Sequence, residues 1–90
     1  MPTIRIPAPL RKLTSNLEEI QVTGGRLDTS LAHLNSTYPG LTERLLDEQG
    51  GVRRFVNIFV NDEDIRFLQG KETPVRESDV ISIVPAQAGG

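Results

Sequence analysis

The sequence predicts an α+β domain in which a mixed sheet wraps on one main helix. Short segments of alternating or β-branched apolar residues lie near both ends of the chain. Between them, one segment has its apolar residues at helical spacing, and paired glycines separate the segments. A chain of 90 residues can bury one core, so we expect a single domain.

Two strands are predicted before the main helix. Residues 3–6 alternate, with two isoleucines facing inward, and prolines end this strand. Residues 10–17 follow as a polar connection. Residues 18–23 alternate again and form the second strand, which a glycine pair ends.

Apolar residues at steps of four, three and four predict the main helix. The stripe consists of Leu27, Leu31, Leu34 and Tyr38. Polar residues in the first turn offer capping groups, and Pro39-Gly40 is expected to end the helix. Residues 41–47 then form a short second helix that buries its leucines.

The last third of the chain is predicted to return to strands. Residues 54–60 are the strongest candidate because they are rich in β-branched and aromatic side chains. A turn at residues 61–63 leads into a short strand over residues 64–67. Residues 70–78 are expected to be irregular with one helical turn, and residues 79–85 form the last strand.

Composition excludes several classes of function. The net charge of −2 gives no electrostatic case for nucleic acid, and the absence of cysteine excludes disulfides, thiolate metal sites and a cysteine nucleophile. No apolar stretch approaches the ~18 residues of a membrane span, and the N-terminus lacks the pattern of a signal peptide. We therefore expect a cytoplasmic protein with neither a nucleic-acid nor a membrane partner.

Few residues suggest catalysis or metal binding. His33 is a lone histidine and is expected to be a surface residue. The carboxylates of residues 61–64 lack the spacing of a calcium loop and fit a hairpin turn better. The basic pairs Arg11-Lys12 and Arg53-Arg54 are either solvent-exposed charge or contacts for an acidic partner. We predict no metal site and no catalytic set.

Phe59 is a candidate for partner binding. Alternate residues of strand 54–60 are expected to pack on the helix, which leaves Phe59 on the open face of the sheet, with Val84 on the same side. An exposed aromatic beside an aliphatic side chain is typical of a partner surface. Alternatively, loop residues such as Leu68 cover Phe59, and the sequence favours neither interpretation.

The segment PAQAGG, residues 85–90, is predicted to be a flexible tail on a domain of residues 1–84. Six extended residues reach roughly 20 Å, and Gly89 and Gly90 can thread a narrow channel because they lack Cβ atoms. A free carboxylate on Gly90 is ionised and is a poor electrophile. It needs activation, for example as an acyl adenylate, before a sulfur or nitrogen nucleophile attacks it.

The sequence resembles the ubiquitin-like β-grasp sulfur carriers, which include the molybdopterin synthase small subunit and the thiamine sulfur carrier. The order of elements, the YPG helix end at residues 38–40 and the finish DVISIVPAQAGG carry the resemblance across nearly the whole chain. LTERLLD (residues 41–47) and RFVNIFVNDEDIRF (residues 54–67) are most similar to the actinobacterial carrier for cysteine biosynthesis. The resemblance implies a β-grasp fold with four to five strands, one main helix and a short second helix.

The resemblance also implies a mechanism. An E1-like adenylyltransferase uses ATP and magnesium to adenylate Gly90, and sulfur then replaces the adenylate to give a thiocarboxylate. Gly89 matches the family motif and Ala88 matches the small residue before it. The carrier binds no cofactor and is a protein co-substrate rather than an enzyme. The open sheet face, with Phe59 and Val84, then contacts the activating enzyme.

The resemblance implies a sulfur-acceptor enzyme as a further partner. In cysteine biosynthesis this is a synthase dependent on pyridoxal phosphate (PLP), followed by a zinc-dependent protease that releases cysteine. In the molybdopterin pathway the tail inserts into the synthase large subunit. Cysteine, thiamine, molybdopterin and a modified tRNA base all remain open as destinations of the sulfur.

Two other functions remain open. Ubiquitin-type tails usually carry arginine near the terminal glycines, whereas this tail has PAQA, which favours a sulfur carrier over a modifier joined to lysines. Some carriers of this family do both. The third interpretation is a plain β-grasp interaction domain.

Overall fold

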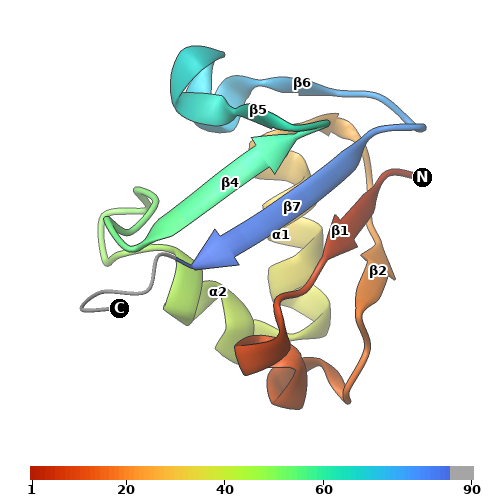
Figure 1. The fold of residues 1–90 in the computed structure, drawn as a ribbon, viewed down its shortest axis with the longest axis vertical. Coiled ribbons are helices and arrows are strands. Elements are labelled where there is room, and N and C mark those ends of the chain that lie inside the picture. Colours follow the sequence, from red (N-terminus) through yellow and green to blue (C-terminus); the bar gives the residue numbers. More distant parts are fainter. Residues whose placement is uncertain (86–90) are drawn as a thin grey trace.

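The computed structural model describes residues 1–85, which form a five-stranded mixed sheet packed on helix α1 (Figure 1). The sheet consists of β1 (Thr3–Arg5), β2 (Glu19–Gln21), β4 (Val56–Val60), β5 (Glu63–Asp64) and β7 (Val80–Pro85). The α-helices and the small second sheet are α1 (Leu27–Thr37), α2 (Pro39–Leu45), β3 (Gly25–Arg26) and β6 (Pro74–Val75). Three 3₁₀ helices complete the fold, namely η1 (Ala8–Thr14), η2 (Ile65–Phe67) and η3 (Gly70–Glu72).

The strand order is β2-β1-β7-β4-β5, and β1 runs parallel to β7 while the other pairs are antiparallel. The register places Ile4 beside Ile20 on one side and Ile81 on the other. The last strand, β7, therefore lies at the centre of the sheet and pairs with the first strand, β1. The predicted mixed sheet on one main helix with a short second helix is confirmed.

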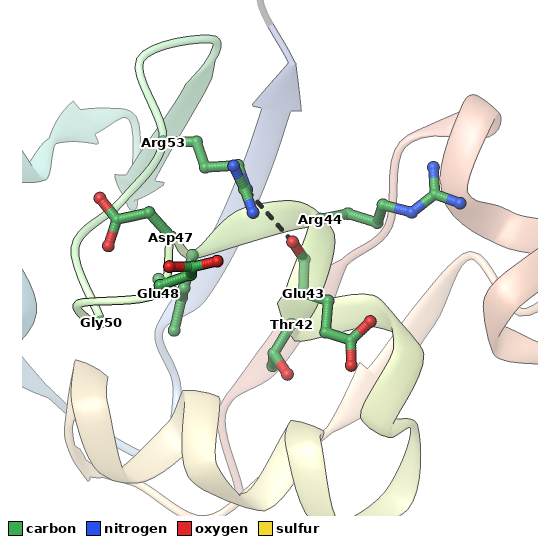
Figure 2. A pocket seen from close by; sticks show the side chains of 8 residues that line it. Thr42, Glu43, Arg44, Asp47, Glu48, Gly50 and Arg53 are labelled. Atoms are coloured by element: carbon green, nitrogen blue, oxygen red, sulfur yellow. Dashed lines mark hydrogen bonds between the residues drawn. The ribbon is translucent and has the colours of Figure 1, made fainter.

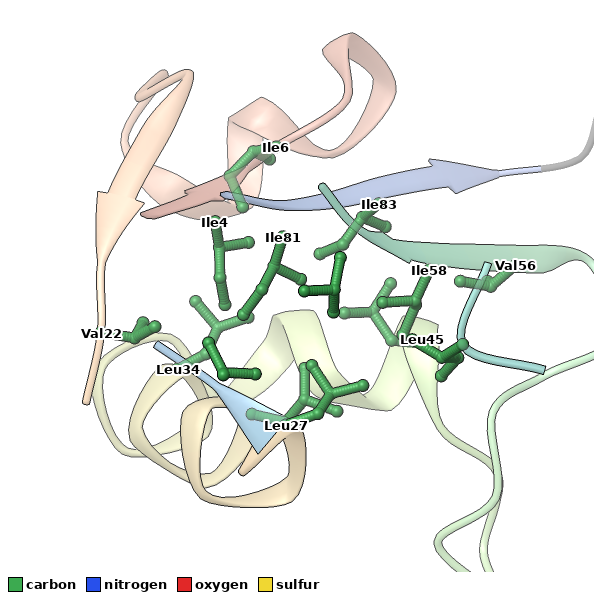
Figure 3. Packing of buried hydrophobic residues seen from close by; sticks show 14 of the residues in the cluster. Ile4, Ile6, Val22, Leu27, Leu34, Leu45, Val56, Ile58, Ile81 and Ile83 are labelled. Carbon is green, nitrogen blue, oxygen red and sulfur yellow. The ribbon is translucent and has the colours of Figure 1, made fainter. Parts of the chain in front are cut away.

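The core lies between the sheet and the two α-helices (Figure 3). Strand residues at a period of two and helix residues at a period near 3.6 both point into it, because these periods bring apolar side chains onto one face. The fully or nearly buried members are Ile4, Ile6, Val22, Leu27, Leu31, Leu34, Leu41, Leu45, Val56, Ile58, Val60, Ile65, Val75, Ile81 and Ile83. Each such side chain contributes about 1.5–3 kcal/mol by leaving water.

Side chains of α1 satisfy the backbone just beyond β2. The Thr23 N–H donates to His33 Nδ1 at 2.7 Å, and Ser30 Oγ donates to the Thr23 carbonyl at 2.6 Å. Because a backbone N–H can only donate, Nδ1 of His33 is the acceptor in the first of these bonds. His33 is half-buried rather than a surface residue, and it links the helix to the edge of the sheet.

Two expected boundaries at prolines differ from the structure. Residues 10–17 were expected to be a polar connection, but η1 spans Ala8–Thr14 with Pro9 in its first turn. α1 ends at Thr37, just before Pro39-Gly40 as expected, but these two residues lie in the first turn of α2 instead of preceding it. Both differences have one cause, since proline fixes φ near helical values and lacks the N–H that a first turn leaves unpaired.

Two further differences lie after β4. The strand expected over residues 64–67 stops at Asp64, because the Asp64 carboxylate accepts a hydrogen bond from Arg66 N and begins η2. The irregular segment of residues 70–78 contains η3, and its residues Pro74 and Val75 pair with β3 instead of forming the expected helical turn.

The acidic segment of residues 61–64 contains the predicted hairpin turn. Asn61 and Asp62 have φ values of 51° and 74°, as in a two-residue turn between antiparallel strands. Asn61 also donates from Nδ2 to Asp79 Oδ1 at 2.7 Å and accepts from Val80 N at 2.9 Å. These bonds tie the β4–β5 hairpin to the start of β7.

Residues 1–85 contain no group of three or more His, Cys, Asp or Glu side chains placed to hold a metal ion. None of the helices in this part of the chain is long and apolar enough to span a membrane.

Candidate functional site

The predicted reactive end of the chain follows directly on the central strand. Ala88, Gly89 and Gly90 lie outside the described residues. Pro85, the first residue of the predicted tail, is the last residue of β7 and lies opposite Val56 of β4. The last described residue therefore lies beside the first residue of β4, and the division at residue 84 stays a prediction.

Phe59 and Val84 lie on the sheet face opposite the core. Their strand neighbours Ile58 and Ile83 are 1% and 3% exposed, whereas Val84 is 45% exposed and Phe59 is half-buried. In the register, Phe59 lies opposite Ser82, two residues from Val84. The two side chains are therefore diagonal neighbours on one face, within reach of each other for an aromatic ring. Their role in partner binding stays a prediction.

A charged cluster borders Phe59, because Asp64 is its partner across the β4–β5 hairpin. Arg66 Nη2 donates to Asp64 Oδ2 and to Asn57 Oδ1, both at 2.7 Å. These hydrogen bonds from Arg66 hold the pKa of Asp64 below its usual value, and the same carboxylate raises the pKa of Arg66. This cluster was not predicted from the sequence, although the spacing of Asp64 and Arg66 in the hairpin was a signal for it.

Two exposed phenylalanines were also missed. Phe67 at the end of η2 is 87% exposed, and Phe55 before β4 is 55% exposed. Leu68, which would cover Phe59 in the alternative interpretation, is itself 37% exposed. The exposure of Phe67 was not predicted because residues 64–67 were assigned to a strand, in which every second side chain is expected to face the core.

A hollow of about 590 Å³ separates α2 from the segment that follows it (Figure 2). Arg53 spans this hollow. Its backbone N–H donates to the Leu45 carbonyl at 2.9 Å, and its Nε donates to the Glu43 carbonyl at 3.1 Å. Helix carbonyls in the last turn lack intrahelical partners, so Arg53 caps α2. The exposed charge predicted for Arg53 thus also has a structural role.

This geometry defines a ubiquitin-like β-grasp protein with an open sheet face and a chain end that follows on the central strand. The sequence pattern of the ThiS family matches residues 4–90, and the chain belongs to this family. The predicted resemblance and fold are both confirmed.

Three relatives make the similarity more specific. The sulfur carrier protein CysO of Mycobacterium tuberculosis is 41% identical over 90 residues, which cover 98% of this chain and 97% of the relative. A chain in the crystal structure of the Amycolatopsis orientalis BexX/CysO complex superposes with a TM-score of 0.93 and 36% identity, and all of both chains is covered. The small archaeal modifier protein 1 of Methanosarcina acetivorans superposes with a TM-score of 0.84 at 29% identity, covering 99% of this chain and 95% of that one.

Proposed function

We propose that this chain is a sulfur carrier protein that serves the biosynthesis of cysteine. The observation that carries the proposal is the 41% identity to a sulfur carrier over 98% of the chain. The relatives named as carriers are small proteins of this size rather than catalysts. The chain then acts as the co-substrate of other enzymes.

The reaction proceeds at the carboxylate of Gly90 in two steps. An E1-like adenylyltransferase uses ATP and magnesium, and a carboxylate oxygen attacks the α-phosphorus and displaces pyrophosphate. Hydrosulfide from a sulfur donor then attacks the carbonyl carbon, AMP leaves with the bonding electron pair, and loss of a proton gives a thiocarboxylate on Gly90. This chain contributes a carboxylate that can enter a narrow active site, because Gly89 and Gly90 have no side chains to obstruct it.

The partners follow from the same proposal. The activating enzyme docks on the open sheet face around Phe59 and Val84, where an apolar surface borders the Asp64–Arg66 pair. A PLP-dependent cysteine synthase accepts the sulfur, and a zinc-dependent protease releases the cysteine. The complex of BexX with CysO supports the idea that carriers of this fold assemble with other proteins.

Deletion of Gly90 tests this proposal. We expect the shortened chain to form no thiocarboxylate when it is incubated with the activating enzyme, ATP and a sulfur donor. Its melting temperature should match that of the full chain, because the core lies within residues 4–83. Full sulfur transfer by the shortened chain would show that the reaction uses another group.

A second candidate function is conjugation to lysines of target proteins. The similarity to a small archaeal modifier over nearly the whole chain favours it. This function predicts adducts of higher mass that depend on Gly90 and contain a branched lysine peptide. The small subunit of molybdopterin synthase is a third assignment, and sulfur transfer to a molybdopterin precursor would identify it.

A further inference from the structure

Three of the five residues of β4 have no strand on their outer edge within residues 1–85. β7 pairs with β4 along its whole length on the inner side, from Val56 to Val60. On the outer side β5 pairs only with Phe59 and Val60. On this side no strand within residues 1–85 pairs with β4 from Val56 to Ile58, although the Val56 N–H already donates to the Arg53 carbonyl at 3.0 Å. An edge without a strand partner is a template for an added strand.

A groove of about 370 Å³ runs along this free edge, between the segment before β4 and the helices η2 and η3. Its apolar floor is made by Val52, Val56, Ile58 and Ile65. These side chains belong to the core or pack against it, so the floor is fixed in place. Alternate residues of a strand laid along the edge would point toward this floor.

The walls of the groove are cationic. They carry Arg53, Arg54, Arg66 and Lys71, and Asp64 is the one carboxylate among the lining residues. Both oxygens of that carboxylate already accept hydrogen bonds from Arg66.

The other three cations, Arg53, Arg54 and Lys71, take part in no ion pair between residues 1–85. Arg53 and Lys71 donate to the neutral backbone carbonyls of Glu43 and Gly50, which leaves their charge uncompensated. The groove is thus positive on a chain whose net charge is −2.

The groove lies close to the exit of the chain end. Val56, in its floor, is the strand partner of Pro85, the last described residue. A protein that engages the residues after Pro85 therefore lies within reach of the free edge.

We propose that the outer edge of β4, from Val56 to Ile58, binds an extended acidic segment of a partner protein as an added strand. Backbone hydrogen bonds to β4 hold the segment, its apolar residues face the groove floor, and its carboxylates pair with Arg53, Arg54 and Lys71. This binding requires no reaction at Gly90, so its test is independent of the sulfur-carrier proposal.

The test uses the full chain labelled with ¹⁵N and a synthetic six-residue peptide that alternates valine and glutamate and has blocked ends. We expect amide shifts at Val56, Asn57 and Ile58, and an affinity that falls as salt is added. Arg54→Glu should weaken binding about threefold or more, since Arg54 forms no ion pair within residues 1–85. Lys12→Glu makes the same change of charge on η1 and should leave the affinity unchanged.

Two further peptides make the result decisive. A peptide that alternates valine and lysine should not bind, and the acidic peptide with alternate backbone nitrogens methylated should lose its binding. The proposal is overturned if acidic and basic peptides bind equally, if Arg54→Glu has no effect, or if methylation is tolerated. Shifts confined to Phe59 and Val84, or self-association of the chain through the β4 edge, would overturn it as well.

Discussion

At the scale of single residues, side-chain hydrogen bonds tie turns and strand ends to segments that are distant in the sequence. Asp79 accepts from Asn61 Nδ2 through one oxygen at 2.7 Å and from Arg76 N through the other at 2.8 Å. Asn61 and Asp79 are 18 residues apart, and nothing local in the sequence joins them. Ser30 and His33 are likewise not joined to Thr23 by any local sequence pattern. These contacts were therefore not predicted.

Asp79→Asn should destabilise the protein at neutral pH and not at acidic pH. The hydrogen bond from Arg76 N, followed by that from Asn61, holds the pKa of Asp79 below its ordinary value. A lowered folded-state pKa gives stability that is complete above the unfolded pKa and disappears as pH falls through the folded one. We expect a loss of about 1 kcal/mol at neutral pH, measured by urea unfolding.

The matched control is Asp62→Asn on the neighbouring turn. Asp62 is exposed, and its carboxylate accepts no hydrogen bond within residues 1–85. This variant should keep its stability at both pH values. A loss for Asp79→Asn that persists unchanged in acid would show that its carboxylate charge is not the cause.

At the scale of elements, the sequence predicted the strands and helices whose spacing of apolar residues is visible within one continuous segment. The period of two in residues 54–60 assigned the faces of β4 correctly, and the leucine stripe located α1. β3 and β6 were not predicted, because each has two residues and exists only through pairing with the other. The positively charged groove was not predicted either, since its cations come from three separate segments.

β7 offers a matched test of the face assignment. Ile83 is 3% exposed in the core, and Val84 is 45% exposed on the open face. Ile83→Ala should cost about 2–4 kcal/mol of unfolding free energy, because it removes buried methyl groups and leaves a cavity. Val84→Ala should cost about 0.5 kcal/mol or less. Equal losses in chemical denaturation would mean that the open face is packed.

At the scale of the whole molecule, the fold brings the chain end out of the centre of the sheet. Parallel pairing with β1 holds β7 on one side from Val80 to Ser82, and antiparallel pairing with β4 holds it on the other side from Ile81 to Pro85. A rigid central strand therefore precedes the segment that carries Gly90. The sequence predicted the sheet, because the order of strands is visible without a structure, and the role of the segment after Pro85 stays a prediction from the terminal motif.

The mass of the C-terminal peptide, measured on protein isolated from the native host, tests the central claim most directly. The sulfur-carrier account predicts that one oxygen of Gly90 is replaced by sulfur, or that a cysteine adduct is found at the same carboxyl group. An unmodified carboxylate under several growth conditions, and again after incubation with an E1-like enzyme, ATP and a sulfur donor, would contradict it.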